Sequence, residues 1–319
     1  MRPKRRPYVH DDFIRIRDLL VETHRAFHPP VNWGIERWNY ARYFVAPMLG
    51  SWGDEGQSVE DSLAAIRLWE EMNGVWETED GEIAGVVCIE HPDVNHPGYG
   101  EIFVQRHPEH IYLLEDMLAY GEERFANPRT GRVHIWVCGG DVSLLKAVRM
   151  RGFVKEESKS HAGQELELSE IPRPELPPGF EILTMADECD VDKRREIFGR
   201  AFDHPEPKEW PSRFAYEELM RAPDYEPEND IFIKADDGTY AACCIIWYDD
   251  HNKIGHMEPV GTHPEYRNLG LGRAIVYEAL RRMRALGATT TPMEGGHEPF
   301  YEAIGFKTVR TWTRWEKDV

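Results

Sequence analysis

Gly255-His-Met-Glu-Pro-Val-Gly-Thr-His-Pro-Glu-Tyr-Arg-Asn-Leu-Gly-Leu-Gly-Arg273 is the stretch of this sequence that decides its fold. The pattern predicts a strand over 256–262, then a short glycine-bearing loop, and then a helix whose apolar residues recur on one face. Backbone N–H groups at a helix N-terminus have no partner inside the helix, and the helix dipole adds about half a positive charge there. The loop and the helix start therefore predict a binding site for a phosphate group.

Two common phosphate loops are excluded by their spacing. The Walker loop needs a lysine after its last glycine, and no lysine follows Gly272. The dinucleotide fingerprint needs a third glycine where this chain has Ile275. What remains is Arg-x-x-Gly-x-Gly, from Arg267 to Gly272. Because Gly270 and Gly272 lack Cβ atoms, a diphosphate can approach this backbone closely.

The run over 263–272 resembles the acetyl-CoA motif of the GCN5-related N-acetyltransferase (GNAT) superfamily. Downstream, Phe300-Tyr-Glu-Ala-Ile-Gly-Phe306 resembles the Tyr-x-x-x-Gly-Phe signature near the C-terminus of that superfamily. The two motifs stand in the family's order and at about its separation. The resemblance implies an α/β (α+β mixed) fold for 179–319, with a central, mostly antiparallel sheet flanked by helices. It also implies transfer of an acetyl group from acetyl-CoA to an amine, with no metal.

The resemblance implies which residues hold acetyl-CoA. The expected diphosphate cradle is Arg267, Asn268, Leu269, Gly270, Leu271, Gly272 and Arg273. In the family the strand before the loop splays from its neighbour, so that the pantetheine arm can pair with a free strand edge. Val260 and Thr262 are then its expected backbone partners. Pro259 has no N–H to donate, which suits a bulge or an edge as well as an ordinary strand end.

Catalytic candidates follow from the same resemblance. Family members commonly remove the proton of the attacking amine with a glutamate on this strand, often through a water. Here Glu258 and His256 stand two residues apart and share a face if the strand is regular. The base is therefore Glu258, His256 or a water. Tyr301 matches the family's phenol, whose ordinary pKa near 10 keeps it protonated and able to donate to the departing thiolate.

The chain reads as a duplication. A proline-rich connector lies near its middle, and Val-x-x-His-Pro-Glu occurs both at 104–109 and at 260–265. Gly-Phe likewise occurs at 152–153 and at 305–306. We therefore expect two tandem acetyltransferase-like domains: 1–172, a linker over 173–178, and 179–319. The further expected elements are helices over 11–26, 36–46, 110–125, 191–202 and 214–221, and strands over 82–90, 100–105, 132–138, 180–183, 231–234 and 240–248.

The N-terminal copy has lost the chemistry. At the same offset, Leu114 and Asp116 replace the two loop glycines, and Ile111 replaces the loop arginine. A leucine crowds the loop, and an aspartate repels a diphosphate. Val148 stands where the second copy has its tyrosine. We therefore expect a degenerate domain that packs against the active one and helps to wall the substrate cleft.

Composition limits the partners. The net charge of −19 disfavours nucleic acid and anionic membrane surfaces, and no apolar run is long enough to span a bilayer. The basic segment over 1–7 leads into no apolar core, so we expect a solvated tail and not a secretion signal. Five cysteines without metal spacing indicate reduced thiols in the cytoplasm. The aromatic residues over 33–52 are expected to be core more than pocket lining.

The sequence therefore predicts an acetyl-CoA-dependent N-acyltransferase that acts by direct transfer on the amine of a small molecule or peptide. Its single active site is expected in the C-terminal half. The alternative is an acyl-CoA-binding sensor or interaction module without catalysis. The pairing of Tyr301 with a carboxylate on the strand favours the enzyme, because binding alone needs neither group.

Overall fold

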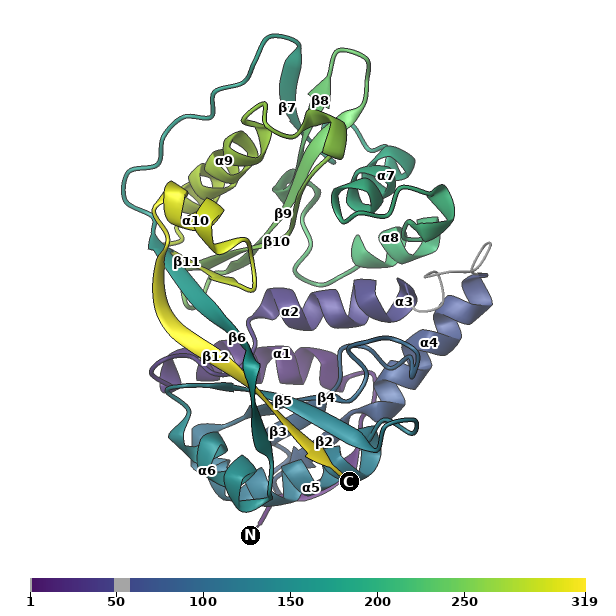
Figure 1. Cartoon of the computed structure of the whole chain (residues 1–319), viewed down its shortest axis with the longest axis vertical. Helices are drawn as coiled ribbons and strands as arrows, with labels where there is room; N and C mark the ends of the chain where they lie inside the picture. Colours follow the sequence, from purple (N-terminus) through teal and green to yellow (C-terminus); the bar gives the residue numbers. More distant parts are fainter. Residues whose placement is uncertain (1, 49–57) are drawn as a thin grey trace.

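A computed structural model of the chain describes residues 2–48 and 58–319. Within these residues twelve strands form one continuous sheet in the order β1-β2-β3-β4-β5-β12-β6-β11-β10-β9-β8-β7. Adjacent strands are antiparallel except for the pairs β4–β5 and β10–β11, which are parallel. Helices pack on both sides of the sheet (Figure 1). The expected mixed fold, with a mostly antiparallel sheet flanked by helices, is confirmed.

The elements of the N-terminal half are, in chain order, β1 (Lys4–Pro7), α1 (Asp12–Thr23), α2 (Ile35–Tyr40), α3 (Ala46–Met48), α4 (Val59–Met72), β2 (Gly74–Glu77), β3 (Ile83–Cys88), β4 (Glu101–Arg106), α5 (Leu114–Phe125), β5 (Arg132–Cys138), α6 (Val142–Met150) and β6 (Val154–Glu167). Those of the C-terminal half are β7 (Phe180–Thr184), α7 (Val191–Ala201), α8 (Arg213–Leu219), β8 (Asp230–Ala235), β9 (Tyr240–Asp249), β10 (Ile254–Thr262), α9 (Leu271–Leu286), β11 (Thr290–Glu294), α10 (Glu298–Ile304) and β12 (Lys307–Asp318). A π-helical turn, Ala41–Val45, joins α2 to α3.

The two halves repeat one order of elements, down to the cap of a short helical turn. After β4, His107 Nδ1 accepts a hydrogen bond from the backbone N–H of Glu109 at 3.2 Å. After β10, His263 Nδ1 accepts the same bond from Glu265, also at 3.2 Å. A helix follows each turn, α5 in the first half and α9 in the second. The repeated pattern in the sequence thus corresponds to a repeated local structure.

The last strands of the two halves are exchanged. Strand β6 ends the first half but pairs with β11 of the second, while β12 ends the second half and pairs with β5 of the first. β6 and β12 also pair with each other along most of their length. In Figure 1 both strands cross from one half to the other, and the C-terminus lies beside the N-terminal half. The exchange joins the two halves through backbone hydrogen bonds.

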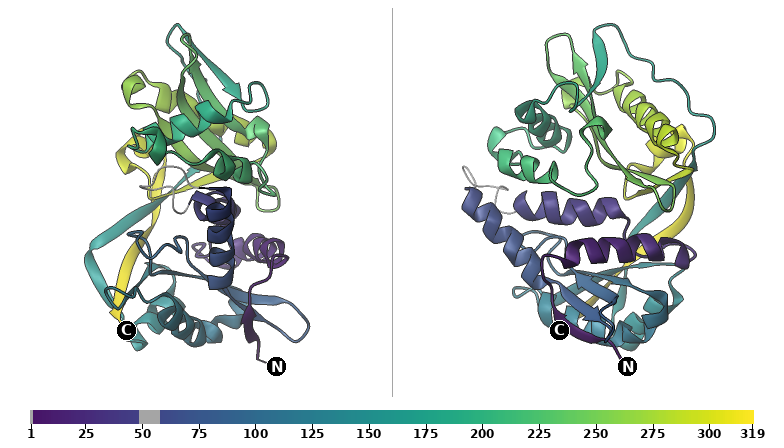
Figure 2. Two further views of the ribbon diagram at one scale, coloured as in Figure 1. Left: turned by 90° about the vertical axis from the view of Figure 1, so that its right-hand side faces the viewer. Right: turned by 180° about the vertical axis from the view of Figure 1, so that it is seen from behind.

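Helix α2 is shared between the cores of the two halves. Trp38 and Ala41 pack with α1, α4 and strands β2 and β3 of the first half. Tyr40 and Phe44 pack instead with α7, α8 and strands β8 and β9 of the second half. Figure 2 shows the same helix between the halves from two further directions. The start of α2 is therefore fixed at the junction, where the site is built.

The N-terminal basic segment is not the solvated tail that the sequence suggested. Its residues Lys4–Pro7 form β1, which pairs antiparallel with β2. Arg6 donates to Asp12 at 2.6 Å and to Glu77 at 2.7 Å, and the Asp12 side chain is fully buried. The basic charge of this segment suggested a solvated tail, but the ion pairs of Arg6 with Asp12 and Glu77 fix it against the rest of the protein.

Cys243 and Cys244 are fully buried packing residues in β9. No helix among the described residues has the length and apolarity needed to cross a membrane.

Candidate active site

The loop between β10 and α9 presents unpaired backbone amides. Asn268 and Gly270 both have positive φ, +66° and +83°, and this turns the chain into the helix that begins at Leu271. Within the part of the chain that the structure describes, none of the N–H groups from Leu269 to Arg273 donates a hydrogen bond to the protein. These N–H groups are therefore free to donate, as the predicted phosphate cradle requires.

Two glycines keep the cradle accessible. A Cβ on Gly270 would meet nothing within 4 Å, so its backbone faces open space. A Cβ on Gly272 would lie 3.1 Å from Thr262 Oγ1. The Arg267 guanidinium donates to the backbone carbonyl of Ala201 at 3.1 Å, and Arg273 is exposed. Charge at the cradle thus comes from the helix start and from two arginines at its rim.

The corresponding place in the first half is closed. Leu114 is buried at the start of α5, and Asp116 forms an exposed ion pair with Arg2 at 2.7 Å. Val148 is fully buried in α6. The first copy has neither a glycine cradle nor a phenol, as the sequence indicated.

Strands β10 and β11 splay apart directly after they meet. Their register contains one pair, Ile254 with Thr290. On its other side β10 pairs with β9 along nearly its whole length, with a bulge between Met257 and Val260. Among the described residues the edge of β10 that faces β11 has no strand partner beyond Ile254. Val260 and Thr262 lie on this strand, where an extended amide chain can add to the free edge.

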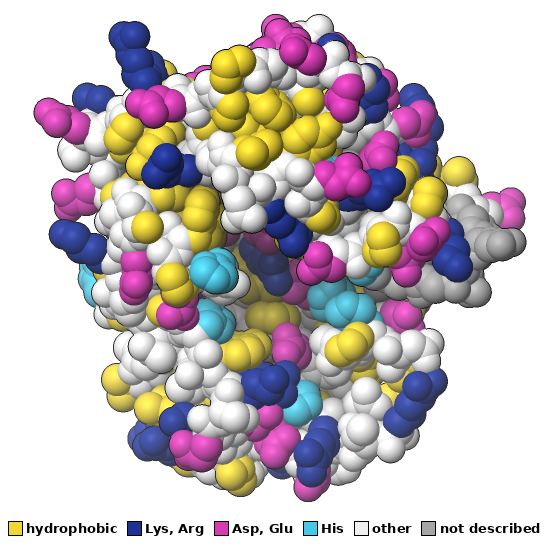
Figure 3. Space-filling view, turned by 45° about the horizontal axis from the view of Figure 1, so that its top comes forward, with side chains coloured by type: hydrophobic (Ala, Val, Ile, Leu, Met, Phe, Trp, Pro, Cys, Tyr) yellow, Lys and Arg dark blue, Asp and Glu magenta, His cyan; other side chains and the backbone are white. Residues whose placement is uncertain are grey.

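A pocket of about 530 Å³ lies between the two halves and receives the side chains at the bulge. His256, Glu258 and Tyr301 all line it, so the structure brings the three sequence candidates together. The opposite wall comes from the first half, chiefly the start of α2 and strand β4. Figure 3 shows a hollow in the middle of one face of the molecule, with histidine side chains near its rim.

Glu258 is held by an arginine of the other half. Arg37 Nη1 donates to Glu258 Oε1 at 2.7 Å, and Arg37 Nη2 donates to Glu90. Burial raises the pKa of Glu258, and the nearby Arg37 charge opposes that rise. The Trp247 indole donates to the Glu258 backbone carbonyl at 2.7 Å, which fixes the bulge. Glu258 is therefore an oriented carboxylate with an increased proton affinity.

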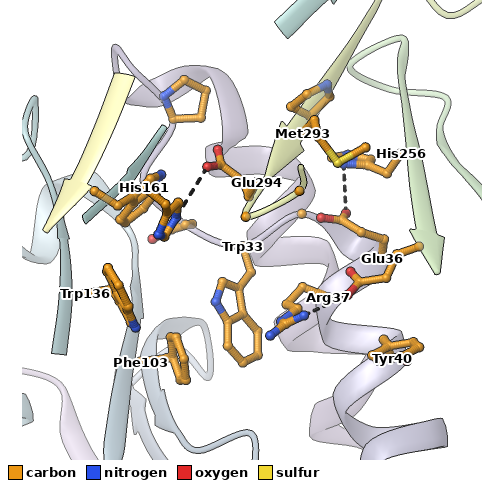
Figure 4. A pocket seen from close by; sticks show the side chains of 18 of the residues that line it. Trp33, Glu36, Arg37, Tyr40, Phe103, Trp136, His161, His256, Met293 and Glu294 are labelled. Carbon is orange, nitrogen blue, oxygen red and sulfur yellow. Dashed lines mark hydrogen bonds and ion pairs between the residues drawn. The ribbon is translucent and has the colours of Figure 1, made fainter. Parts of the chain in front are cut away.

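His256 pairs with a second carboxylate, Glu36, at 3.1 Å between Nδ1 and Oε2. Burial raises the pKa of Glu36 to about 8, with the charge of Glu258 as a smaller cause. Burial lowers the pKa of His256 to about 3. At neutral pH the imidazole is therefore uncharged and Glu36 is mostly protonated. Figure 4 shows the pair at one side of the pocket, close to Arg37 and Tyr40.

Gly34 makes room for this pair. It precedes α2 as the N-cap residue, and a Cβ on it would lie 2.2 Å from Glu36 Oε2 and 2.7 Å from His256 Cε1. Glu36 lies in the first turn of α2, where the helix dipole favours a carboxylate. Its Oε2 is buried without a hydrogen bond of good geometry.

Tyr301 closes the remaining side of the pocket. It lies in α10, and its ring packs edge-on against Phe300 and Phe306. A Cβ on Gly296 would lie 2.5 Å from Tyr301 Cε2, so the preceding loop touches the ring. Burial raises the pKa of the phenol, which stays protonated at neutral pH.

Comparison with known proteins agrees with this geometry. Residues 192–306 match the acetyltransferase (GNAT) family. The chain is 25% identical over 257 residues to a mycothiol acetyltransferase of Saccharomonospora viridis, covering 73% of this chain and 79% of the relative. A GCN5-related N-acetyltransferase structure from Sphaerobacter thermophilus superposes with a TM-score of 0.58, at 18% identity, over 99% of this chain and 95% of that one.

A second solved structure has two such domains in one chain. It is a tandem GNAT protein from the clavulanic acid biosynthesis pathway, with a TM-score of 0.56, 14% identity and coverage of 89% of this chain and 94% of that one. This chain is a tandem GNAT-superfamily protein. Together with the family match, the relatives support an acetyltransferase that uses acyl-CoA.

Sequence analysis of this GNAT protein did not single out Glu36 or Arg37. Both lie in the N-terminal half, more than two hundred residues from the strand they contact. The aromatic segment over 33–52 was expected to be mostly core. Trp38 and Phe44 are core, Trp33 lines the pocket, and Tyr40 is a core residue that also lines it. Trp52, the last aromatic of that segment, lies outside the described residues.

Proposed function

We propose that the chain transfers an acetyl group directly from acetyl-CoA to the amine of a small molecule or peptide. One observation carries the proposal. Strand β10 leads from a pocket with a half-buried carboxylate and a protonated phenol straight into a loop with free backbone amides. Binding of a carrier needs the loop alone, whereas transfer needs all three parts.

The carrier follows β10. Its diphosphate accepts hydrogen bonds from the amides of Leu269–Arg273, and its pantetheine arm pairs with the free edge at Val260 and Thr262. A thioester at the end of that arm then reaches the bulge at Glu258 and Pro259. The N–H groups from Leu269 to Arg273 have no protein partner among the described residues, whereas the Thr262 carbonyl already accepts a hydrogen bond from Arg267 Nε at 3.4 Å.

The acceptor amine binds between the halves. Relatives that are acetyltransferases imply an amine acceptor in general. As an ammonium, the acceptor donates to the buried Glu36 oxygen, and it passes a proton to Glu258, directly or through a water. The increased pKa of Glu258 suits this role. With a pKa of about 3, His256 is a weaker base and serves to hold Glu36.

In the chemical step, the amine nitrogen forms a bond to the thioester carbon, and the carbon–sulfur bond then breaks. Tyr301 donates its proton to the departing thiolate, so that free CoA leaves as the thiol. The nitrogen loses a second proton as the amide forms, and this proton restores the Tyr301 phenol. One proton in total thus passes from the ammonium through Glu258 to solvent. The products are an N-acetylated acceptor and CoA.

Release of thiol from acetyl-CoA across a panel of amines tests the proposal. The panel includes the unacetylated precursor of mycothiol, because several relatives are named mycothiol acetyltransferases. We expect turnover with at least one amine, and a loss of turnover in Tyr301→Phe. Tyr112→Phe, at an exposed tyrosine of the first half, is the matched control. Tight acetyl-CoA binding without turnover of any amine would contradict the proposal and favour a sensor.

A further inference from the structure

The end of the pocket away from Glu36 is lined by aromatic rings. Trp33, Phe103, Trp136 and Trp312 all line the pocket and are half-buried. The Trp33 and Phe103 ring centroids are 4.7 Å apart. In Figure 4 Phe103 and Trp136 lie on one side of the pocket and Glu36 and His256 on the other, with Trp33 between them beside Arg37. The pocket therefore has an acidic end and an aromatic end.

The aromatic end occupies a particular place in the duplicated fold. Strands β4 and β5 meet in only two pairs, Glu101 with His134 and Ile102 with Ile135. Phe103 and Trp136 are the next residues on the two strands, at the point where the strands separate. In the second half the equivalent opening between β10 and β11 is the proposed place of the carrier arm. In the first half two aromatic side chains stand in it.

Charged and amide groups around these rings already have partners. Glu101 accepts from Arg314 at 3.2 Å, and Glu294 accepts from Arg310 at 2.7 Å. The Gln105 side-chain oxygen accepts from the Trp33 backbone N–H at 2.8 Å. A ligand at this end therefore meets ring faces, paired carboxylate and amide groups, and the buried Trp312 indole N–H, which has no hydrogen-bond partner among the described residues. A polyhydroxylated ligand could pair with that one donor but would have to break the other pairs or leave hydroxyl groups unpaired, which is unfavourable.

We propose that the opening between β4 and β5 is a subsite for a flat aromatic ring, and that the acceptor is an arylalkylamine. This inference rests on the proposed function, because the amine must lie at the acidic end. The ring stacks among Trp33, Phe103 and Trp136 at the centroid separations that aromatic pairs prefer. A short alkyl chain joins it to the ammonium. The first half thus binds the acceptor in the cleft where a second carrier would otherwise bind.

Thiol release with matched amines tests the subsite. We expect phenethylamine and tryptamine to exceed n-butylamine and glucosamine in kcat/KM by about tenfold or more, since a pocket that fits an apolar group discriminates on that scale. Trp136→Leu and Phe103→Leu should each remove most of that preference, measured as the ratio of kcat/KM for phenethylamine to kcat/KM for n-butylamine. Tyr112→Leu, which replaces an exposed aromatic outside the pocket, is the control. Circular dichroism checks that each variant folds. If one of the two leucine variants does not fold, the other is used to test the subsite.

Each outcome decides one of the two claims. Glucosamine or n-butylamine turned over as well as phenethylamine would overturn the aromatic subsite while the proposed function stands. Turnover of no amine would contradict the proposed function, and calorimetric binding of phenethylamine then tests the subsite independently. Binding weakened about tenfold by Trp136→Leu or Phe103→Leu supports the subsite, and unchanged binding overturns it.

Discussion

Replacing Glu36 by glutamine should remove most of a pH dependence of stability. The pKa of Glu36 is about 8 in the folded protein, compared with 4.5 for an ordinary glutamate side chain. Between these values the folded chain holds a proton that the unfolded chain releases. Its contribution to stability is therefore fully present below about pH 4.5 and is lost as the pH rises through about 8.

The size of the effect follows from the shift. Each pKa unit corresponds to about 1.4 kcal/mol, so the full contribution is about 5 kcal/mol, of which about 4 kcal/mol is lost between pH 5 and pH 9. Between pH 5 and pH 9 the free energy of unfolding of wild type should therefore fall by about 4 kcal/mol relative to that of Glu36→Gln. Because the difference between the two proteins is measured, groups that titrate equally in both cancel.

Urea unfolding at a series of pH values measures the difference directly. The free energy of unfolding of wild type minus that of Glu36→Gln should fall by about 4 kcal/mol from pH 5 to pH 9. Glu79→Gln removes an exposed carboxylate from the same half and serves as the control. A difference that stays constant, or rises with pH, would refute the view that burial keeps Glu36 protonated beside His256.

Three further changes test other parts of the account. Tyr301→Phe should lower kcat by about 100-fold or more while the dissociation constant of acetyl-CoA stays the same, since a general acid contributes on that scale; equal loss of carrier binding would show that the ring is structural. Glu258→Gln should lower kcat by a similar factor and Arg37→Met by less, measured by thiol release; a greater loss in Arg37→Met would shift the base role away from Glu258. Cutting a protease site placed in the linker over 173–178 should leave the two pieces together in size-exclusion chromatography, because β6 and β12 are exchanged; separation into two folded pieces would contradict the exchange.

The carrier loop could be predicted because its determinants are local. Gly270 and Gly272 sit next to the helix they start, and Asp237-Gly238 lies between the two strands it joins. In the same way the cap formed by His263 recurs with its own short motif. Short-range patterns of this kind can be recognised in a single sequence.

The pocket could be predicted only in part, since its walls depend on long-range packing. The exchange of β6 and β12 leaves no local sign, because either strand could pair within its own half. Glu36 and Arg37 read as ordinary charges on a helix until α2 is placed between the halves. Helix α4 was not predicted at all, although Ser58 and Asp61 form a capping box that the sequence contains. Strand β1 was missed because the basic residues over 1–7 suggested a solvated tail, and its pairing with β2 depends on residues about seventy positions away.

The most direct test of the central claim is calorimetric titration of acetyl-CoA into the full chain and into Gly272→Asp, which installs the residue that the first half has as Asp116. The account predicts one carrier per chain for wild type, and binding weakened at least 100-fold in Gly272→Asp, because a carboxylate then faces the diphosphate at the helix start. Two carriers per chain, or undiminished binding in Gly272→Asp, would contradict a single carrier site at the free amides of Leu269–Arg273.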